Sequence, residues 1–380
     1  MRGGLLAARG FLLALGLAAC AQPAEESAAA GVDYAEPGPY AARRHTWALT
    51  DAARARTFEV EVWSPAVAWP ASPQGMSELL SDPTQAATFA ALLAASPADC
   101  ASRTSAAHPE GEGAEGGPWP LVMMSHCHGC TRFSTASVAA HLATHGFVVV
   151  APDHAGNTLF DTLAGAGLPL DTETLALREG DVAYAHAAAL AGELGVQVNP
   201  DRVGAFGHSF GAVTVGSFLQ QGLAELGGPR AALFVGAPPE NPLLPGVEMG
   251  ALGAPLLFLR LAEDHSVGEA GNLLMAANFE AAPGVAWQVD MADAGHWSPS
   301  DLVGLVEDFM PGCGEDTRAV GGGSFAYLPA ARGRALTGFV AAAFFAWALE
   351  GAESGAAALA EPPSEFEVTA NAAAPTLRGP

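Results

Sequence analysis

Residues 202–221 read RVGAFGHSFGAVTVGSFLQQ and combine the pattern of a strand with that of a helix. An apolar run at 202–206 predicts a buried strand, and the pattern at 212–221 predicts a helix. Between them lies the pentapeptide Gly207-His208-Ser209-Phe210-Gly211, a G-x-S-x-G pattern. Between a strand and a helix, this pattern presents a serine hydroxyl on a sharp turn. The sequence therefore predicts Ser209 as a nucleophile at a helix N-terminus, where free N–H groups and the helix dipole favour developing negative charge.

Strands and helices alternate on both sides of this turn. Apolar strands are expected at 121–125, 147–151, 231–235, 255–261 and 285–291, and helices at 135–145, 172–194 and 330–350. This alternation predicts an α/β fold with a mostly parallel central sheet and helices on both faces. Residues 64–118 are rich in Pro, Ser, Ala and Gly and are interpreted as an insertion with one helical stretch, at 76–95. The apolar run at 335–349 is shorter than the roughly 20 residues of a membrane span, which favours a helix packed on the sheet.

The composition is that of an acidic globular chain. Half of the residues are apolar, and 40 acidic residues face 16 basic ones, all arginine, for a net charge of -24. Such a chain has no electrostatic footprint for a phosphate backbone, which argues against nucleic acid as a partner. Its 380 residues suffice for one large domain, which we place at 46–355.

The N-terminus resembles an export signal. Arg2 and Arg9 precede an apolar stretch at 11–19, which ends in Leu17-Ala18-Ala19-Cys20. This tetrapeptide resembles the bacterial lipobox, which implies cleavage before Cys20, lipid attachment to its thiol and a place in the cell envelope, held to a membrane by the lipid. An ordinary signal peptide with a chance cysteine is the alternative. We accordingly expect a signal peptide at 1–20, a flexible tether at 21–45 and a flexible tail at 356–380.

A serine nucleophile needs a base, and the base needs an orienting acid. In folds of this kind the order along the chain is serine, acid, histidine. His296 lies in a loop after the strand that ends at Met291 and is the expected base; His265, the other histidine downstream of Ser209, directly follows an acid candidate. That acid is Asp264, which follows the strand at 255–261. Glu263 and Glu240 are the alternatives.

The oxyanion hole of a serine hydrolase uses two backbone N–H groups. One is expected from Phe210, and the other from His128 in the loop at 125–132, which follows a strand. The alternative for this loop is a metal site of His126, Cys127, His128 and Cys130. Because an exported protein favours oxidised thiols, we expect no metal. The cysteines after Cys20 allow three connectivities, and the possible pairs are Cys127–Cys130 and Cys100–Cys313.

Three segments carry a resemblance to a known family: 125–132, 141–154 and the turn at Ser209. They resemble the platelet-activating-factor acetylhydrolase and predicted dienelactone hydrolase group of the α/β-hydrolase superfamily, and more distantly the cutinase-type bacterial polyester hydrolases. The resemblance covers roughly residues 55–350 and implies an α/β-hydrolase fold. Cys127 stands where the group usually has glycine. The acetylhydrolases place their acid after the preceding strand, which here offers no aspartate, and strict dienelactone hydrolases use a cysteine nucleophile.

Together these features predict a carboxylic ester hydrolase that works through an acyl-enzyme on Ser209 and needs no cofactor. Its substrate is expected to be a small-molecule, lipid or polyester ester. The alternative is a non-catalytic envelope module that binds a ligand on the same fold.

Overall fold

The computed structural model describes Met1 and residues 32–68, 72–109, 111–222 and 224–374. The predicted signal peptide, Cys20 and the first part of the predicted tether therefore lie outside the described residues, apart from Met1. Contacts within residues 32–374 form the folded unit that carries the site.

Strands alternate with helices on both sides of the serine turn. The strands are β1 Ala41–Asp51, β2 Arg56–Ala66, β3 Gln74–Gly75, β4 Thr104–Ser105, β5 Trp119–Ser125, β6 Val148–Pro152, β7 Val198–His208, β8 Ala231–Val235, β9 Leu256–Leu261, β10 Ala286–Met291, β11 Glu315–Thr317, β12 Ser324–Ala326 and β13 Phe366–Ala370. The α-helices are α1 Pro83–Ala95, α2 Ala136–Thr144, α3 Leu159–Leu163, α4 Thr172–Leu190, α5 Phe210–Gly222, α6 Gly268–Glu280, α7 Ala330–Glu350 and α8 Glu353–Ala360. Three short 3₁₀ helices are η1 Met76–Leu79, η2 Met249–Ala251 and η3 Glu307–Phe309.

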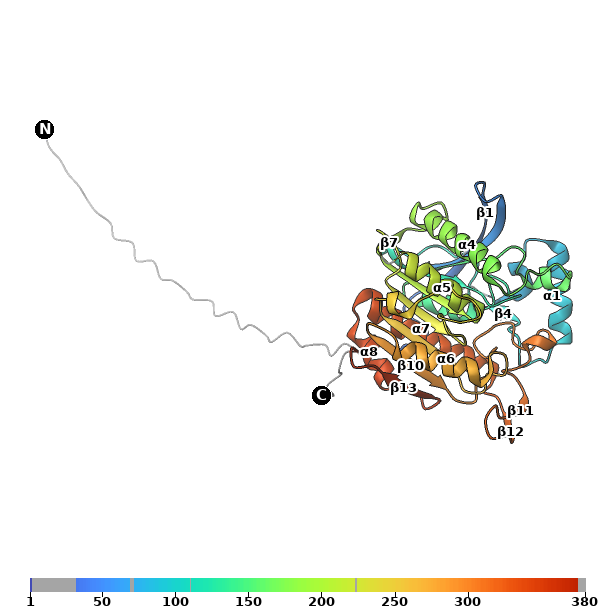
Figure 1. Cartoon of the computed structure of the whole chain (residues 1–380). Helices are drawn as coiled ribbons and strands as arrows, with labels where there is room; N and C mark the ends of the chain where they lie inside the picture. Colours follow the sequence, from blue (N-terminus) through green and yellow to red (C-terminus); the bar gives the residue numbers. More distant parts are fainter. Residues whose placement is uncertain (2–31, 69–71, 110, 223, 375–380) are drawn as a thin grey trace. The chain divides into compact units, whose positions relative to one another are not determined.

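Nine of these strands form the central sheet, in the order β1-β2-β6-β5-β7-β8-β9-β10-β13. Figure 1 labels β1, β7, β10 and β13 among them. The six strands from β6 to β10 in this order are parallel to one another, whereas the pairs β1–β2, β2–β6 and β10–β13 are antiparallel. The predicted mostly parallel sheet is thus confirmed. In such a sheet the carboxyl ends of neighbouring strands meet at one edge, where ligands bind.

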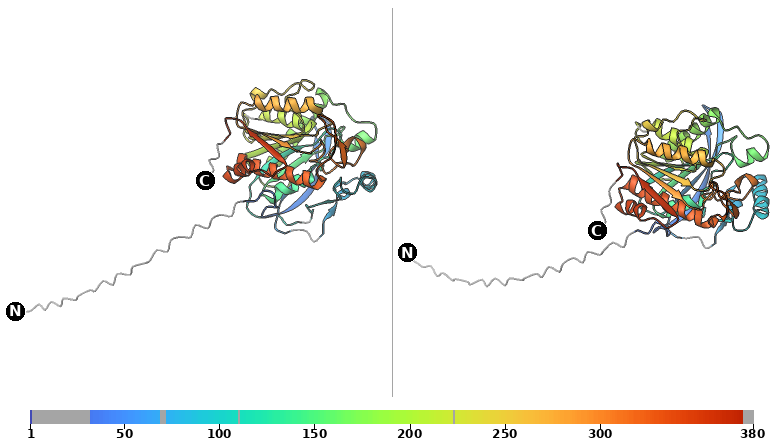
Figure 2. Two further views of the ribbon diagram at one scale, coloured as in Figure 1. Left: turned by 90° about the horizontal axis from the view of Figure 1, so that it is seen from below. Right: turned by 60° about the horizontal axis from the view of Figure 1, so that its bottom comes forward.

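Helices cover the sheet on both faces, as predicted (Figure 2). Leu121 and Met123 of β5 pack in one hydrophobic layer with residues of α4, α5 and α6. Val122 and Met124, which alternate with them, pack in a second layer with α2 and α7. Strands buried on both faces read as continuous apolar runs, which is why the sequence reveals them without alternation.

The helix α7 has the bounds that its apolar pattern predicts. Its residues pack against α2 and the sheet, in the second hydrophobic layer. Among the described residues, no helix combines the length and the hydropathy that crossing a membrane requires.

The C-terminal segment differs from the prediction of a flexible tail at 356–380. The prediction is wrong up to residue 374, because α8 continues to Ala360 and β13 pairs antiparallel with β10. Phe366 is buried against this edge. The pairing covers the backbone groups that β10 would otherwise leave open.

The predicted tether also ends earlier than expected, because β1 begins at Ala41. Its sequence includes the polar residues Arg43, Arg44 and His45, so it lacks the apolar pattern that would predict a strand. Arg44 is nevertheless buried, since its guanidinium lies 2.8 Å from the Glu61 carboxylate on β2. The ion pair between Arg44 and Glu61 joins β1 to β2 where an apolar contact would be expected, and no apolar sequence pattern marks such a pair.

The insertion at 64–118 differs in one detail. The single helix expected at 76–95 is divided into η1 and α1. Asp82 separates them: its side chain accepts hydrogen bonds from the N–H groups of Thr84 and Gln85, and Pro83 follows as the first helical residue. An aspartate N-cap before proline is a typical helix start.

Candidate active site

Ser209 lies on a strained turn between β7 and α5. Its φ of 57° is in the left-handed region, which a non-glycine residue rarely adopts. Its N–H donates to the carbonyl of Val235, 2.8 Å away. A Cβ at Gly207 would lie 2.2 Å from the Gly211 carbonyl, and one at Gly211 would lie 2.0 Å from the Ser125 carbonyl. Both glycines of the motif are therefore required by close backbone packing.

Asp264 and His296 form a buried pair. The Asp264 Oδ2 accepts a hydrogen bond from His296 Nδ1 at 2.6 Å. The other oxygen, Oδ1, accepts from the N–H groups of Ser266 and Val267, at 2.8 and 3.0 Å. Burial alone would raise the pKa of Asp264, but His296 and these two N–H groups hold the pKa below its ordinary value. An ionised carboxylate on Nδ1 leaves His296 Nε2 as the basic nitrogen.

Two contacts place this pair beside the serine turn. A Cβ added to Gly236 would lie 3.4 Å from His296 Nδ1 and 3.6 Å from Asp264 Oδ2, and Gly236 directly follows the residue that binds Ser209 N–H. His208, next to Ser209, donates from Nε2 to the His296 carbonyl at 2.8 Å. Burial and the neighbouring His296 lower the pKa of His208 to about 3, so its ring is neutral. His208 thus ties the His296 loop to the serine turn.

The Ser209 hydroxyl itself makes no hydrogen bond with His296 among the described residues. In unliganded serine hydrolases this bond is often long and tightens only with substrate. The structure nevertheless brings together the nucleophile, base and acid that the sequence predicts.

The alternative acids have other partners. Glu263 lies 2.6 Å from the Arg318 guanidinium and accepts from the Ala319 N–H. Glu240 accepts from the Met249 N–H at 2.6 Å. His265, the alternative base, is exposed.

The loop at 125–132 packs directly against the serine turn, as the close approach of Gly211 to Ser125 shows. Its peptide between Cys127 and His128 has a fixed direction. The Cys127 carbonyl accepts from His126 Nδ1 at 2.7 Å and from the Cys130 N–H at 3.4 Å. Because a trans peptide is planar, the His128 N–H points the opposite way. In the described part of the chain it donates to no protein acceptor.

The second expected donor is Phe210. As the first residue of α5, it has no helical carbonyl one turn earlier to accept its N–H. The His128 and Phe210 rings lie with their centroids 6.1 Å apart, so the loop and the helix start are neighbours.

Both expected disulfides are present in the structure, Cys127–Cys130 and Cys100–Cys313. The first uses both sulfurs of the alternative metal site. His126 also has both ring nitrogens engaged, because its Nε2 accepts from the His154 N–H at 3.1 Å. No group of three or more metal-ligating side chains occurs among the residues that the structure describes.

A cavity of about 320 Å³ opens at Ser209 and Phe210. Its walls are mainly apolar, and they include Val213, Leu244 and Leu274. Leu243, at its margin, is 81% exposed. Part of this wall comes from α6, which the sequence analysis did not detect.

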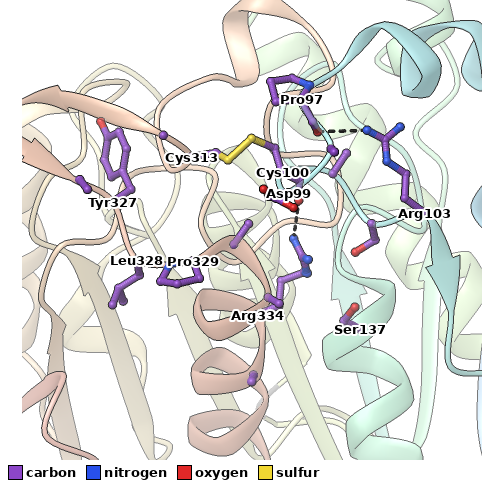
Figure 3. A pocket seen from close by; sticks show the side chains of 18 of the residues that line it. Pro97, Asp99, Cys100, Arg103, Ser137, Cys313, Tyr327, Leu328, Pro329 and Arg334 are labelled. Atoms are coloured by element: carbon purple, nitrogen blue, oxygen red, sulfur yellow. Dashed lines mark hydrogen bonds between the residues drawn. A yellow bond between two sulfur atoms is a disulfide. The ribbon is translucent and has the colours of Figure 1, made fainter.

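A larger cavity, of about 1030 Å³, lies elsewhere, beside the Cys100–Cys313 disulfide (Figure 3). Arg334 there donates to the Cys100 carbonyl at 3.0 Å, and Arg103 donates to the Pro97 carbonyl at 3.0 Å. None of the three triad residues lines it. Of these two cavities, only the smaller one is lined by Ser209.

Arg178 on α4 is a buried residue of this region that the sequence does not predict. Its guanidinium donates a hydrogen bond to Ser125 in the loop at 125–132 and contacts the Phe210 ring. A lone arginine in a helical segment has no pattern that marks it as buried, so only the structure reveals it.

Comparisons with known proteins agree with the fold. Residues 47–164 match the sequence model of the family "Platelet-activating factor acetylhydrolase, isoform II", which confirms the resemblance predicted from the sequence. This match includes the loop at 125–132 and ends before Ser209. The chain is also similar to the structure of a ferulic acid esterase from Streptomyces cinnamoneus, with a TM-score of 0.59 and 21% identity over 85% of this chain and 94% of that one. The predicted α/β-hydrolase fold is thereby confirmed. No curated protein gives a significant match.

Proposed function

We propose that this chain, a carboxylic ester hydrolase by its family match and fold, is a serine esterase that forms an acyl-enzyme on Ser209. One observation carries the proposal. The carboxylate of Asp264 lies 2.6 Å from Nδ1 of a buried histidine, His296, whose loop is tied to the turn that presents Ser209. A serine, a histidine and an acid in this order and geometry are the machinery of acyl transfer.

The reaction would proceed in two steps. The Ser209 oxygen attacks the ester carbonyl carbon while His296 Nε2 takes the hydroxyl proton, and the N–H groups of His128 and Phe210 bind the resulting oxyanion. The bond to the alcohol oxygen then breaks, and His296 returns the proton to the leaving alcohol. Water attacks the acyl-enzyme in the same manner, giving the carboxylic acid and free Ser209.

A fluorophosphonate probe tests this proposal. Such a probe reacts with an activated serine, so the wild-type protein should be labelled at one site, which peptide mass spectrometry should identify as Ser209. A folded protein without labelling would favour the alternative, a non-catalytic module that binds a ligand on this fold.

The role of the loop predicts different effects for two substitutions at position 128. His128→Ala keeps the N–H and loses two contacts of the ring, the hydrogen bond to the Leu168 carbonyl, 3.0 Å long, and the contact with the Phe210 ring. His128→Pro removes the N–H, and the loss of one oxyanion donor costs roughly 3 kcal/mol, or about 100-fold in kcat. We expect the alanine variant to lose less than about tenfold, measured as kcat for p-nitrophenyl esters.

A metal site in this loop predicts the opposite pattern. Alanine at His126, Cys127 or Cys130 would then abolish activity, and a chelator would inactivate the wild-type protein. Stoichiometric zinc or copper that is lost together with activity would overturn the oxyanion role.

For the substrate, we propose an ester whose acyl chain occupies the apolar cavity at Ser209. Ala270 lines this cavity from α6. Ala270→Phe should shorten it and lower kcat/KM for p-nitrophenyl octanoate by about tenfold, while the acetate ester changes by less than about twofold. The matched control is Ala277→Phe, two turns along the same helix and outside the cavity. Equal losses for both chain lengths would contradict an acyl site here. A polyester film beside this panel tests the polymeric substrate.

We also propose that the chain is exported and held to a membrane by a lipid on Cys20. The lipobox-like tetrapeptide at 17–20 supports this proposal. Cys20→Ser should release the protein from membranes or block its processing, which fractionation and mass spectrometry would reveal. A soluble, unmodified mature protein that begins at another residue would contradict it.

A further inference from the structure

A buried arginine lies beneath the two proposed oxyanion donors. Arg178 on α4 is fully buried. On the loop side, its Nη2 donates to the His126 carbonyl and, at 3.1 Å, to the Ser125 hydroxyl oxygen. On the other side, its Nε donates to Thr214 Oγ1 of α5 at 3.0 Å. One planar guanidinium therefore joins the oxyanion loop to the helix that begins at Phe210.

The guanidinium also stacks on Phe210. Its central carbon lies 4.5 Å from the centroid of the Phe210 ring. A cation over an aromatic face at this distance is attracted to it. Arg178 therefore contacts the structure around both proposed donors. It contacts the ring of Phe210, whose N–H is one donor, and the carbonyl of His126, two residues before the other donor, His128.

This arginine has no carboxylate in direct contact among the described residues. Burial lowers the pKa of Arg178 to about 9, although Asp181 opposes this, so the group remains charged at neutral pH. A chain of hydrogen bonds through Ser125 and His154 links Arg178 to Asp181. The Ser125 hydroxyl lies 3.0 Å from His154 Nε2, and His154 Nδ1 lies 3.3 Å from Asp181 Oδ2.

The direction of these hydrogen bonds follows from the donors. Arg178 can only donate, so Ser125 accepts from it and donates its own proton to His154. Burial lowers the pKa of His154 well below its ordinary value, so the ring is neutral and donates from Nδ1 to Asp181. Ser125, His154 and Asp181 have the residue types of a catalytic triad. All three are buried, and none lines a cavity described above.

We propose that Arg178 is a positioning residue for the esterase reaction, and that it sets the direction of the His128 and Phe210 N–H groups toward the oxyanion. The inference rests on the proposed function. By holding the His126 carbonyl, Arg178 fixes the peptide between His126 and Cys127, and the His126 ring in turn holds the Cys127 carbonyl at 2.7 Å. The buried Ser125–His154–Asp181 chain supports this arrangement and takes no part in catalysis.

The test compares three variants: Arg178→Lys, Arg178→Met and the control Arg44→Lys. Lysine keeps the charge but cannot bridge several acceptors as a planar fork does. Arg44 is also a buried arginine, but its partners are Glu61, Gln74, Thr46 and Glu78, so it reaches the oxyanion loop only through Glu61, which also binds Arg132. Circular dichroism and thermal melting establish that each variant is folded. Kinetics with p-nitrophenyl esters give kcat and KM.

An alkyl trifluoromethyl ketone distinguishes positioning from general destabilisation. Its adduct with a serine places an oxyanion in the hole, whereas the product carboxylate does not need the hole. We expect kcat to fall about tenfold in Arg178→Lys and about 100-fold in Arg178→Met, at nearly constant KM. Affinity for the ketone should fall by a similar factor, and affinity for the product should not. Arg44→Lys should leave kcat, the affinity for the ketone and the affinity for the product close to the wild-type values.

Three results would overturn the proposal. They are an unchanged kcat and ketone affinity in folded Arg178→Lys, a rise in KM alone, and an equal loss in Arg44→Lys. If Arg178→Met does not fold, the lysine variant decides. Failure of the esterase proposal is distinguishable, since the wild-type protein would then neither react with fluorophosphonate nor hydrolyse the esters.

Discussion

Replacing Ser209 with alanine is expected to lower kcat for ester hydrolysis by on the order of 10⁶-fold. The substitution removes the atom that forms the acyl-enzyme, so the remaining oxyanion donors can assist only direct attack by water. KM should change little, because the alanine side chain leaves the cavity walls intact. Steady-state kinetics with p-nitrophenyl esters would measure both constants.

The matched control is Ser217→Ala. Ser217 is a buried serine on α5, two turns after the nucleophile, and its hydroxyl accepts a hydrogen bond from Gln221 at 3.0 Å. This variant should keep nearly full activity. If Ser209→Ala retained more than a few per cent of the wild-type rate, another residue would be the nucleophile.

The second large effect is expected for Asp264→Asn, with a loss of about 10⁴-fold in kcat. The amide has nearly the same shape, but it no longer draws the proton of His296 to Nδ1. The imidazole then adopts the tautomer whose Nε2 cannot accept a proton from Ser209. The control is Glu263→Gln, the adjacent carboxylate, which binds Arg318 and not His296. A severe loss in Glu263→Gln with normal activity in Asp264→Asn would exchange the two assignments.

The same variant has a predicted effect on stability. The folded-state pKa of Asp264 is lowered from an ordinary value of 3.8. Its ionised form therefore stabilises the fold above that ordinary pKa, and this contribution is lost as the pH falls through the folded-state pKa. Chemical unfolding at several pH values should show less loss of stability in acid for Asp264→Asn than for the wild type. An unchanged acid profile would contradict the lowered pKa.

Local patterns were sufficient for the elements that are buried on both faces or are strongly apolar. The strand at 231–235 and the helix at 330–350 have the predicted bounds, because continuous apolar runs ended by glycine or proline leave little choice. The helix α6 was missed since its sequence, GEAGNLLMAANFE, contains glycine and asparagine, which favour helices weakly. The edge strands β1 and β13 were missed because pairing with a neighbour, and not an apolar pattern, holds them.

The sequence was sufficient to predict Ser209 as the nucleophile and the order of the proposed triad. The glycines at 207 and 211 flank Ser209 at positions where no Cβ fits, so the turn can be recognised from residues adjacent in the sequence. The choice between Asp264 and Glu263 as the acid required the folded structure. The hydrogen bond of 2.6 Å between Asp264 and His296, 32 residues away, depends on how two loops pack together. The place of Arg178 was likewise decided in space. Its partners come from three segments distant in sequence, the loop at 125–132, Asn157 and α5, and no local pattern encodes a group whose environment is assembled only when the sheet and helices pack.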